Sequence, residues 1–175
     1  MEQQDERDVQ RAAIAQLLPQ LRAAARLLTR SRAEADDLVQ DAVLRMLRGL
    51  DGFVAGPEYA GDVVAALRPW GLAILRNAFR EDWRKRRRDD LHVQSQARED
   101  EGQAGGQETM ARMRDLGRAL ATLPPALREA LVLVGAQGLS HEEAAQICKV
   151  PVGTMKARVS RARASLAKTL GSVNG

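Results

Sequence analysis

Residues 140–163, SHEEAAQICKVPVGTMKARVSRAR, decide the fold of the C-terminal half of the chain. Ser140 is a preferred residue type at the N-cap of a helix, and two glutamates follow where the first turn would lie. The short helix expected over 140–148 is followed by a turn at 149–151 and by a basic helix from Val152. A short helix, a tight turn and a basic helix together predict a helix-turn-helix motif.

The basic helix has an apolar face and a polar face on opposite sides, at about 100° per residue. The apolar face consists of Met155, Val159, Ala162 and Leu166. The opposite face consists of Lys156, Ala157, Ser160 and Arg161, and the apolar face is flanked by Arg158 and Arg163. A recognition helix needs this arrangement, because one face anchors it while the opposite face enters the major groove and the flanking cations hold phosphates. A plain amphipathic helix is the alternative.

Two shorter helices are expected before this motif. The first is a stripe of apolar residues over 116–123 that stops at Pro124 and Pro125. The second runs over 126–134 and ends in the stretch from Gly135 to Gly138. Cys148 is expected on the inward side of the helix over 140–148, as a small buried apolar residue.

The charges are unevenly distributed along the 175 residues. The chain has 27 basic and 23 acidic residues, a net charge of +4, and its last 24 residues contain five basic residues and no acidic one. Residues 89–110 contain six acidic residues, one basic residue and few large apolar ones. Such a segment cannot bury enough surface to offset the entropy of ordering it, so we expect an acidic flexible linker between two basic-edged modules. A solvated basic helix is the alternative explanation of the basic C-terminus.

The composition predicts an all-α fold without metal or cofactor. Aromatic residues make up only 3% of the chain, while residues that favour helices are abundant. One cysteine excludes a disulfide framework, and His92 and His141 lie too far apart to suggest a metal site. No apolar run approaches the roughly 18 residues of a membrane span, and the acidic N-terminus is unlike a signal peptide. We therefore expect a soluble cytoplasmic protein that does not act at a membrane.

Two amphipathic helices are expected in the first half. Their apolar stripes cover 17–28 and 35–50, and the second helix begins with acidic residues. These acidic residues are Glu34, Asp36, Asp37 and Asp41. They either suit the helix dipole or form a docking surface for a basic partner.

A third helix is expected over 70–87, with Pro69 in its first turn and a loop over 53–67 before it. Leu72, Leu75, Phe79 and Trp83 would form its apolar seam. Beside the seam, within about 80° of one another, lie Arg76, Arg80, Arg84 and Arg87. Arginine forks match phosphate geometry, so this helix is a candidate to follow a DNA backbone. The basic run over 84–88 has a second explanation, a helix end favoured by the dipole.

Three stretches together resemble the extracytoplasmic-function (ECF) sigma factors of bacteria. They are 34–43, which resembles region 2.2, 69–88, which resembles regions 2.3 and 2.4, and 123–163, which resembles region 4. Two further features, over 74–88 and 133–140, resemble the alphaproteobacterial general-stress subgroup. The resemblance implies two small helical domains, region 2 over 8–88 and region 4 over 111–172, joined by the linker over 89–110.

The resemblance also implies partners and contact residues. Core RNA polymerase would be bound through its β′ clamp helices and β flap, and a small anti-sigma factor would hold the protein inactive. The polymerase contacts would be Asp36, Asp37, Leu38, Gln40 and Asp41. The loop over 54–66 would capture a flipped base of the −10 element, and the −10 DNA contacts would be Asn77, Arg80, Arg84 and Arg87. The −35 contacts would be Thr154, Lys156, Ala157, Arg158, Ser160, Arg161 and Arg163.

The sequence departs from the family pattern at four positions. Lys149 stands where members usually have glycine, and a left-handed backbone there would cost roughly 1 kcal/mol. Pro69 and Gly71 stand where the subgroup usually has helix formers, and Ala157 replaces a residue that is often serine. These departures bear on the −10 loop and on one polar −35 contact.

Two other classes of protein are alternatives. A sigma-like decoy would titrate an anti-sigma factor, but such a protein tends to lack the basic surfaces seen at 84–88 and in the helix from Val152. A helix-turn-helix repressor would not need the acidic helix and would usually need a dimerisation element. No catalytic residue is predicted, because no nucleophile, acid–base pair or phosphate loop stands out.

Overall fold

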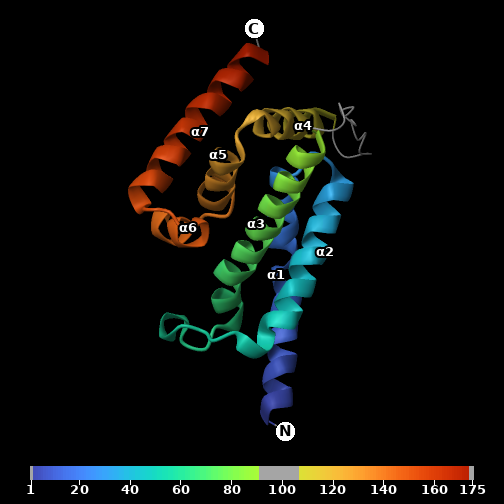
Figure 1. The fold of residues 1–175 in the computed structure, drawn as a ribbon, viewed down its shortest axis with the longest axis vertical. Coiled ribbons are helices and arrows are strands. Elements are labelled where there is room, and N and C mark those ends of the chain that lie inside the picture. Colours follow the sequence, from blue (N-terminus) through green and yellow to red (C-terminus); the bar gives the residue numbers. More distant parts are fainter. Residues whose placement is uncertain (1, 91–106, 174–175) are drawn as a thin grey trace.

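A computed structural model describes residues 2–90 and 107–173, which form helices joined by turns, with no strand among them. The predicted all-α fold is confirmed. Figure 1 shows the long helices of the first half side by side, with helices of the second half on one side of them and across one end. The outermost of these is the last helix of the chain.

The first three long helices are α1 (Glu2–Leu28), α2 (Arg32–Gly49) and α3 (Val63–Asp90). Their predicted apolar stripes face one another, and residues such as Leu21, Met46 and Leu72 are buried in the shared core. Two short 3₁₀ turns, η1 (Leu50–Gly52) and η2 (Pro57–Tyr59), lie in the connection between α2 and α3. The core fixes the orientation of α2 and α3, and with it the faces that they expose.

Helix α3 begins earlier than the sequence predicted. It starts at Val63, and Pro69 lies inside it rather than in its first turn. The side chain of Asp62 accepts a hydrogen bond of 2.9 Å from the amide of Ala65, which is the action of an N-cap residue. Burial of Ala66 and Leu67 holds the added turn in place, so tertiary packing overrides the proline signal.

The second half contains α4 (Gln107–Thr122), α5 (Pro125–Ala130), η3 (Leu131–Ala136), α6 (His141–Cys148) and α7 (Val152–Val173). The predicted cap of α6 is present, since Ser140 and Glu143 form a reciprocal capping box. The prediction of an α-helix up to Val134 was incomplete, because η3 is π-helical. Residues 91–106 of the predicted linker lie outside the described residues. Helix α4 begins at Gln107, before the apolar stripe that was expected over 116–123.

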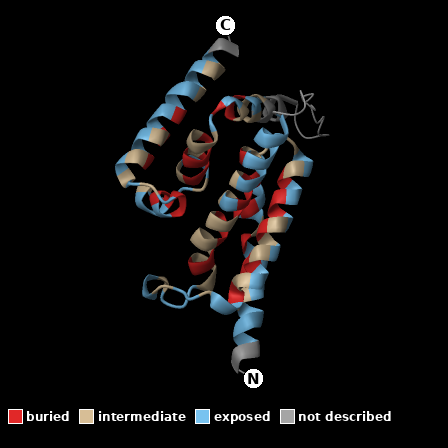
Figure 2. Ribbon diagram, in the orientation of Figure 1, coloured by how far each residue is buried: buried red, intermediate tan, exposed pale blue. Residues whose placement is uncertain are grey.

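The two halves share one hydrophobic core. Buried residues of α3, such as Leu75, belong to the same cluster as Leu133 and Ile147 of the second half. Figure 2 shows buried residues on the facing sides of α3, α5 and α6, whereas most of the outward side of α7 is exposed. The sequence predicted the two halves as separate domains, and in the structure they pack directly against each other.

Candidate nucleic-acid interface

Helix α7 exposes the face that the sequence predicted for DNA recognition. Its apolar side is buried through Met155, Val159 and Ala162. The residues of the opposite side are exposed, and they are Lys156, Ala157, Ser160 and Arg161. Arg163 is also exposed, while Thr154 and Arg158 are half-buried at the flank. The arrangement gives a rigid helix with a polar, cationic surface and no acidic side chain of its own.

The turn before α7 has a left-handed backbone at Lys149, with φ 54° and ψ 48°. The amide of Val150 donates a hydrogen bond of 3.0 Å to the carbonyl of Ala145, and this closes the end of α6 in the manner of a helix C-cap. The expected left-handed site is therefore present, and a lysine occupies it at a cost of about 1 kcal/mol.

The predicted −10 residues of α3 fall into two groups. Asn77, Arg84 and Arg87 are exposed, so they are free to contact a ligand from solvent. Arg80 is half-buried and lies next to Glu129 of α5. Its guanidinium carbon also lies 5.9 Å from the ring centroid of Trp83, on which Arg87 stacks at 5.2 Å. Trp83 is half-buried, and its ring makes cation–π contacts with two arginines, so it is not solely a core residue.

Glu129 is the residue that sequence reasoning missed. It is 1% exposed, and its carboxylate oxygens lie 3.3 Å from Nε of Arg76 and 3.4 Å from Nε of Arg80. Burial raises the pKa of this carboxyl, although the two arginines favour its charged form. Glu129 lies on the opposite side of α5 from the apolar stripe, so the helical pattern gave no reason to expect it to be buried. The one available signal was that its negative charge could pair with the column of arginines predicted on another helix.

Arg128, the preceding residue, makes a second contact between the halves. Its guanidinium donates hydrogen bonds to the carbonyl of Leu28 at 2.8 Å and to the carbonyl of Ala121 at 2.7 Å. Burial lowers the pKa of Arg128 to about 10, so the side chain stays protonated at neutral pH. A cleft of about 160 Å³ remains beside it, lined in part by Glu34, Trp83 and Arg87.

The predicted polymerase-docking residues of α2 are mostly on one exposed face. Asp36, Asp37 and Gln40 are exposed, and half-buried Asp41 pairs with Arg45 at 2.9 Å. Leu38 is 2% exposed, so it is a core residue and does not belong to this surface. Its burial follows from the apolar stripe of the same helix.

Two leucines extend this face toward the end of α2. Leu44 and Leu47 are 50% and 41% exposed, and they follow Gln40 at helical spacing. Leu47 was predicted to be part of the buried stripe, which is wrong at this position. An acidic face that ends in exposed leucines has both the charge and the apolar area that a protein partner can cover.

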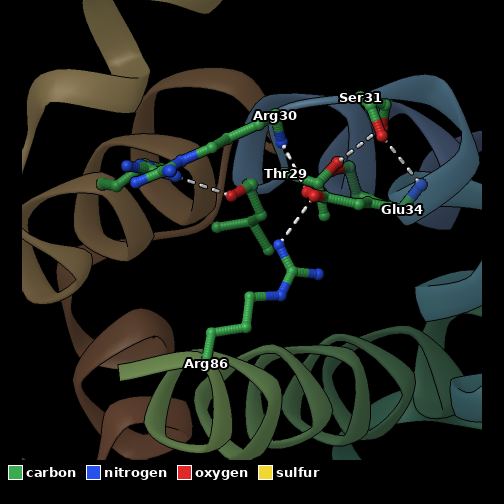
Figure 3. Close-up of polar contacts among 8 residues, drawn as sticks. Thr29, Arg30, Ser31, Glu34 and Arg86 are labelled. Carbon is green, nitrogen blue, oxygen red and sulfur yellow. Dashed lines mark hydrogen bonds and ion pairs between the residues drawn. The ribbon is translucent and has the colours of Figure 1, made fainter. Parts of the chain in front are cut away.

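A polar network at the turn between α1 and α2 positions the acidic helix (Figure 3). Ser31 caps α2 by accepting a hydrogen bond of 3.1 Å from the amide of Glu34. The Glu34 carboxylate accepts a hydrogen bond of 3.0 Å from the amide of Arg30 and pairs with Arg86 of α3 at 2.7 Å. Burial opposes the ionisation of Glu34, but the contacts with Arg86 and Arg30 outweigh it, and its pKa is lowered.

Neither a metal site nor a membrane span is present in the part of the chain that the structure describes. Within residues 2–90 and 107–173, no group of three histidine, cysteine or acidic side chains could hold a metal ion. The same residues include no helix with the length and apolarity to cross a membrane.

Comparison with known proteins identifies the family. A family model of sigma-70 region 2 matches residues 13–89, and a model of sigma-70 region 4 matches residues 113–166. The ECF RNA polymerase sigma factor EcfG of Rhodopseudomonas palustris (strain TIE-1) is 42% identical over 153 residues, which cover 87% of this chain and 80% of that protein. SigM, an ECF sigma factor of Mycobacterium tuberculosis, is 35% identical over 155 residues, which cover 89% and 74%.

A solved structure agrees with these matches. The sigma factor RpoE of Bartonella quintana, crystallised with the anti-sigma factor NepR, superposes with a TM-score of 0.76 at 36% identity and covers 90% of this chain and 94% of that one. The fold and its two basic surfaces therefore define a sigma-70 type transcription initiation factor. More specifically, the chain belongs to the family of ECF RNA polymerase sigma factors, and the predicted resemblance, including that to the general-stress subgroup, is confirmed.

Proposed function

We propose that this sigma factor binds core RNA polymerase through the exposed face of α2. Asp36, Asp37, Gln40 and Asp41 supply its negative charge, and the exposed leucines extend its contact area. The β′ clamp helices are the proposed partner for this face, and the β flap is the proposed partner for the second half. In this proposal region 2 spans 8–88, region 4 spans 111–172, and 89–110 is the linker between them.

Promoter DNA is the proposed ligand of the two basic surfaces. Helix α7 would read the −35 element, and α3 with the loop over 54–66 would hold the −10 strand. The observation that supports this most strongly is the geometry of α7, whose buried stripe fixes the helix while Lys156, Ser160 and Arg161 face solvent. The exposed side chains of Asn77, Arg84 and Arg87 support the −10 role. Within the loop, the side chain of Val54 is 88% exposed and accessible to a ligand. The last four residues expected in this loop, 63–66, belong to helix α3 instead.

A small anti-sigma factor is the proposed inhibitor. The support is the likeness to RpoE, which was crystallised with such a factor. We also propose that the protein acts in the cytoplasm and has no catalytic activity, metal or cofactor of its own, because its work is to position the polymerase.

Run-off transcription with bacterial core polymerase tests this function. Purified protein is added to core enzyme and a library of templates with varied −35 and −10 elements, and promoter-dependent transcripts are expected only when the protein is present. A variant in which Asp36 and Asp37 are both replaced by Asn should lose core binding in a gel-filtration or fluorescence assay. Failure to direct any transcript would contradict the sigma function and favour the decoy alternative.

A further inference from the structure

Polar contacts of Arg128, Arg68 and Glu129 join the two halves of the molecule. Arg128 donates to the end of α1, Arg68 of α3 donates to the carbonyl of Gln137 at the end of η3, and Glu129 lies between Arg76 and Arg80. Only the third of these contacts involves residues of the basic face of α3. It therefore connects the packing of the halves with the proposed DNA surface.

Glu129 occupies its two arginines in the way that a DNA phosphate would. Guanidinium groups recognise carboxylates and phosphates through the same charge and the same planar geometry. With Glu129 in place, the side chains of Arg76 and Arg80 are only 15% and 24% exposed. A phosphate cannot reach their Nε atoms unless α5 moves away.

The buried carboxylate is also poorly satisfied. Among the described residues, neither oxygen of Glu129 has a partner with hydrogen-bond geometry, and the Nε atoms of Arg76 and Arg80 likewise have none. Removing such charges from water carries a large free-energy penalty, which their mutual attraction offsets only when the geometry is good. The contact is thus specific but weakly stabilising, and opening it returns all three charged groups to water or to a new partner.

We propose that Glu129 competes with promoter DNA for Arg76 and Arg80, so that the free sigma factor is held in a closed form and DNA binds after the second half has moved off α3. This inference rests on the proposed function of α3 as a DNA surface. Glu129 acts as an intramolecular mimic of a phosphate group. The exposed residues Asn77, Arg84 and Arg87 remain available for a first encounter with DNA in the closed form.

Binding of single-stranded DNA to the full chain without polymerase tests the competition. The probe is a fluorescein-labelled 20-nucleotide single strand of mixed sequence, followed by anisotropy. Glu129→Gln should bind it about three- to tenfold more tightly than the unchanged protein, because the open form is more populated. Glu142→Gln, which removes an equal charge from an exposed position on α6, is the matched control and should leave the affinity unchanged.

The distance between the two halves gives a second test, which does not depend on one variant being stable. Spin labels are placed at Ala33→Cys on α2 and Ala167→Cys on α7 in a Cys148→Ala background, and their separation is measured by pulsed electron resonance. Addition of the single strand should lengthen the distance in the otherwise unchanged chain, and Glu129→Gln should lengthen it without DNA. If Glu129→Gln does not fold, Glu129→Asp replaces it, because it keeps the charge but shortens the reach.

The outcomes separate this inference from the proposed function. DNA binding with an unchanged distance, or equal affinities for Glu129→Gln and Glu142→Gln, would overturn the competition even if run-off transcription succeeds. A failed run-off assay with longer distances and tighter binding in Glu129→Gln would contradict the sigma function while the competition stands.

Discussion

Single residues at two turns fix the local geometry that the larger elements depend on. Lys149 holds a left-handed backbone between α6 and α7, and Glu34 joins the start of α2 to α3 through Arg86. The left-handed backbone at Lys149 was expected from the family pattern, because family members usually have glycine at this position. The pairing of Glu34 with Arg86 was not expected, because it depends on how two helices pack and leaves no mark in either segment alone.

Replacing Lys149 by glycine should stabilise the protein. Glycine adopts the left-handed region without the steric cost that a Cβ atom incurs, so Lys149→Gly is expected to raise the free energy of unfolding by about 1 kcal/mol. For a chain of this size, that corresponds to a rise in melting temperature of about 2–4 °C. Thermal unfolding followed by circular dichroism measures it, and Lys149→Ala, which keeps the Cβ atom, is the control that should show no such gain.

Replacing Glu34 by glutamine should lower stability in a pH-dependent way. The pKa of Glu34 is lowered in the folded state, so the stability that it contributes is present above its unfolded pKa of about 4.3 and is lost as the pH falls through the folded pKa. Glu34→Gln should cost about 1 kcal/mol at pH 7, and the difference from the unchanged protein should be smaller at pH 3, because the stabilisation is lost as the pH falls toward and through the lowered folded pKa. Urea titrations at both pH values measure this, and a difference that is undiminished in acid would contradict the ionic origin.

At the scale of the elements, α7 is the helix whose buried and exposed faces could be predicted most fully. Its faces follow from a strict 3.6-residue pattern, and burial of Met155 and Val159 confirms the side that packs. Helix α3 was harder to predict, since Pro69 suggested a later start and the capping role of Asp62 was overlooked. The π-helical segment η3 was not foreseen, because the apolar spacing over 126–134 fits an α-helix.

Substitution on the exposed face of α7 should change promoter choice. Arg161→Ala removes a guanidinium from the proposed −35 contact, and the loss of one bidentate base contact costs about 1–3 kcal/mol of discrimination. Run-off transcription from matched and mutated −35 templates should therefore show a clear loss of selectivity, while core binding is retained. Arg22→Ala, at an exposed position on α1, serves as the control for net charge. Unchanged promoter choice in Arg161→Ala would remove this side chain from the recognition face.

At the scale of the whole molecule, the two halves of the closed form make one packed unit, because buried residues of both belong to one hydrophobic cluster. The sequence predicted two modules and their composition, but it contained no sign that Leu133 and Ile147 would share a cluster with Leu75. Amphipathic faces can be recognised in a sequence, whereas the choice of which faces meet depends on shape and on the alignment of charges such as Glu129 with Arg76.

Truncation of Leu133 should destabilise the first half as well as the second. Leu133 is buried in the shared cluster, and Leu133→Ala is expected to cost about 2–5 kcal/mol. Trp70 and Trp83 both lie on α3, so tryptophan fluorescence reports unfolding of the first half. The fluorescence transition should shift to lower urea together with the circular dichroism signal. A fluorescence transition that does not move would show that the halves unfold independently.

The adjacency of Arg128 and Glu129 has a consequence for how the molecule can move. Consecutive residues leave a helix about 100° apart, and these two side chains contact different helices of the first half, the end of α1 and the flank of α3. While both contacts are intact, helix α5 can neither rotate about its axis nor slide along it. We expect its displacement to have few intermediate positions, so that distances across the junction fall into two classes instead of a continuous range.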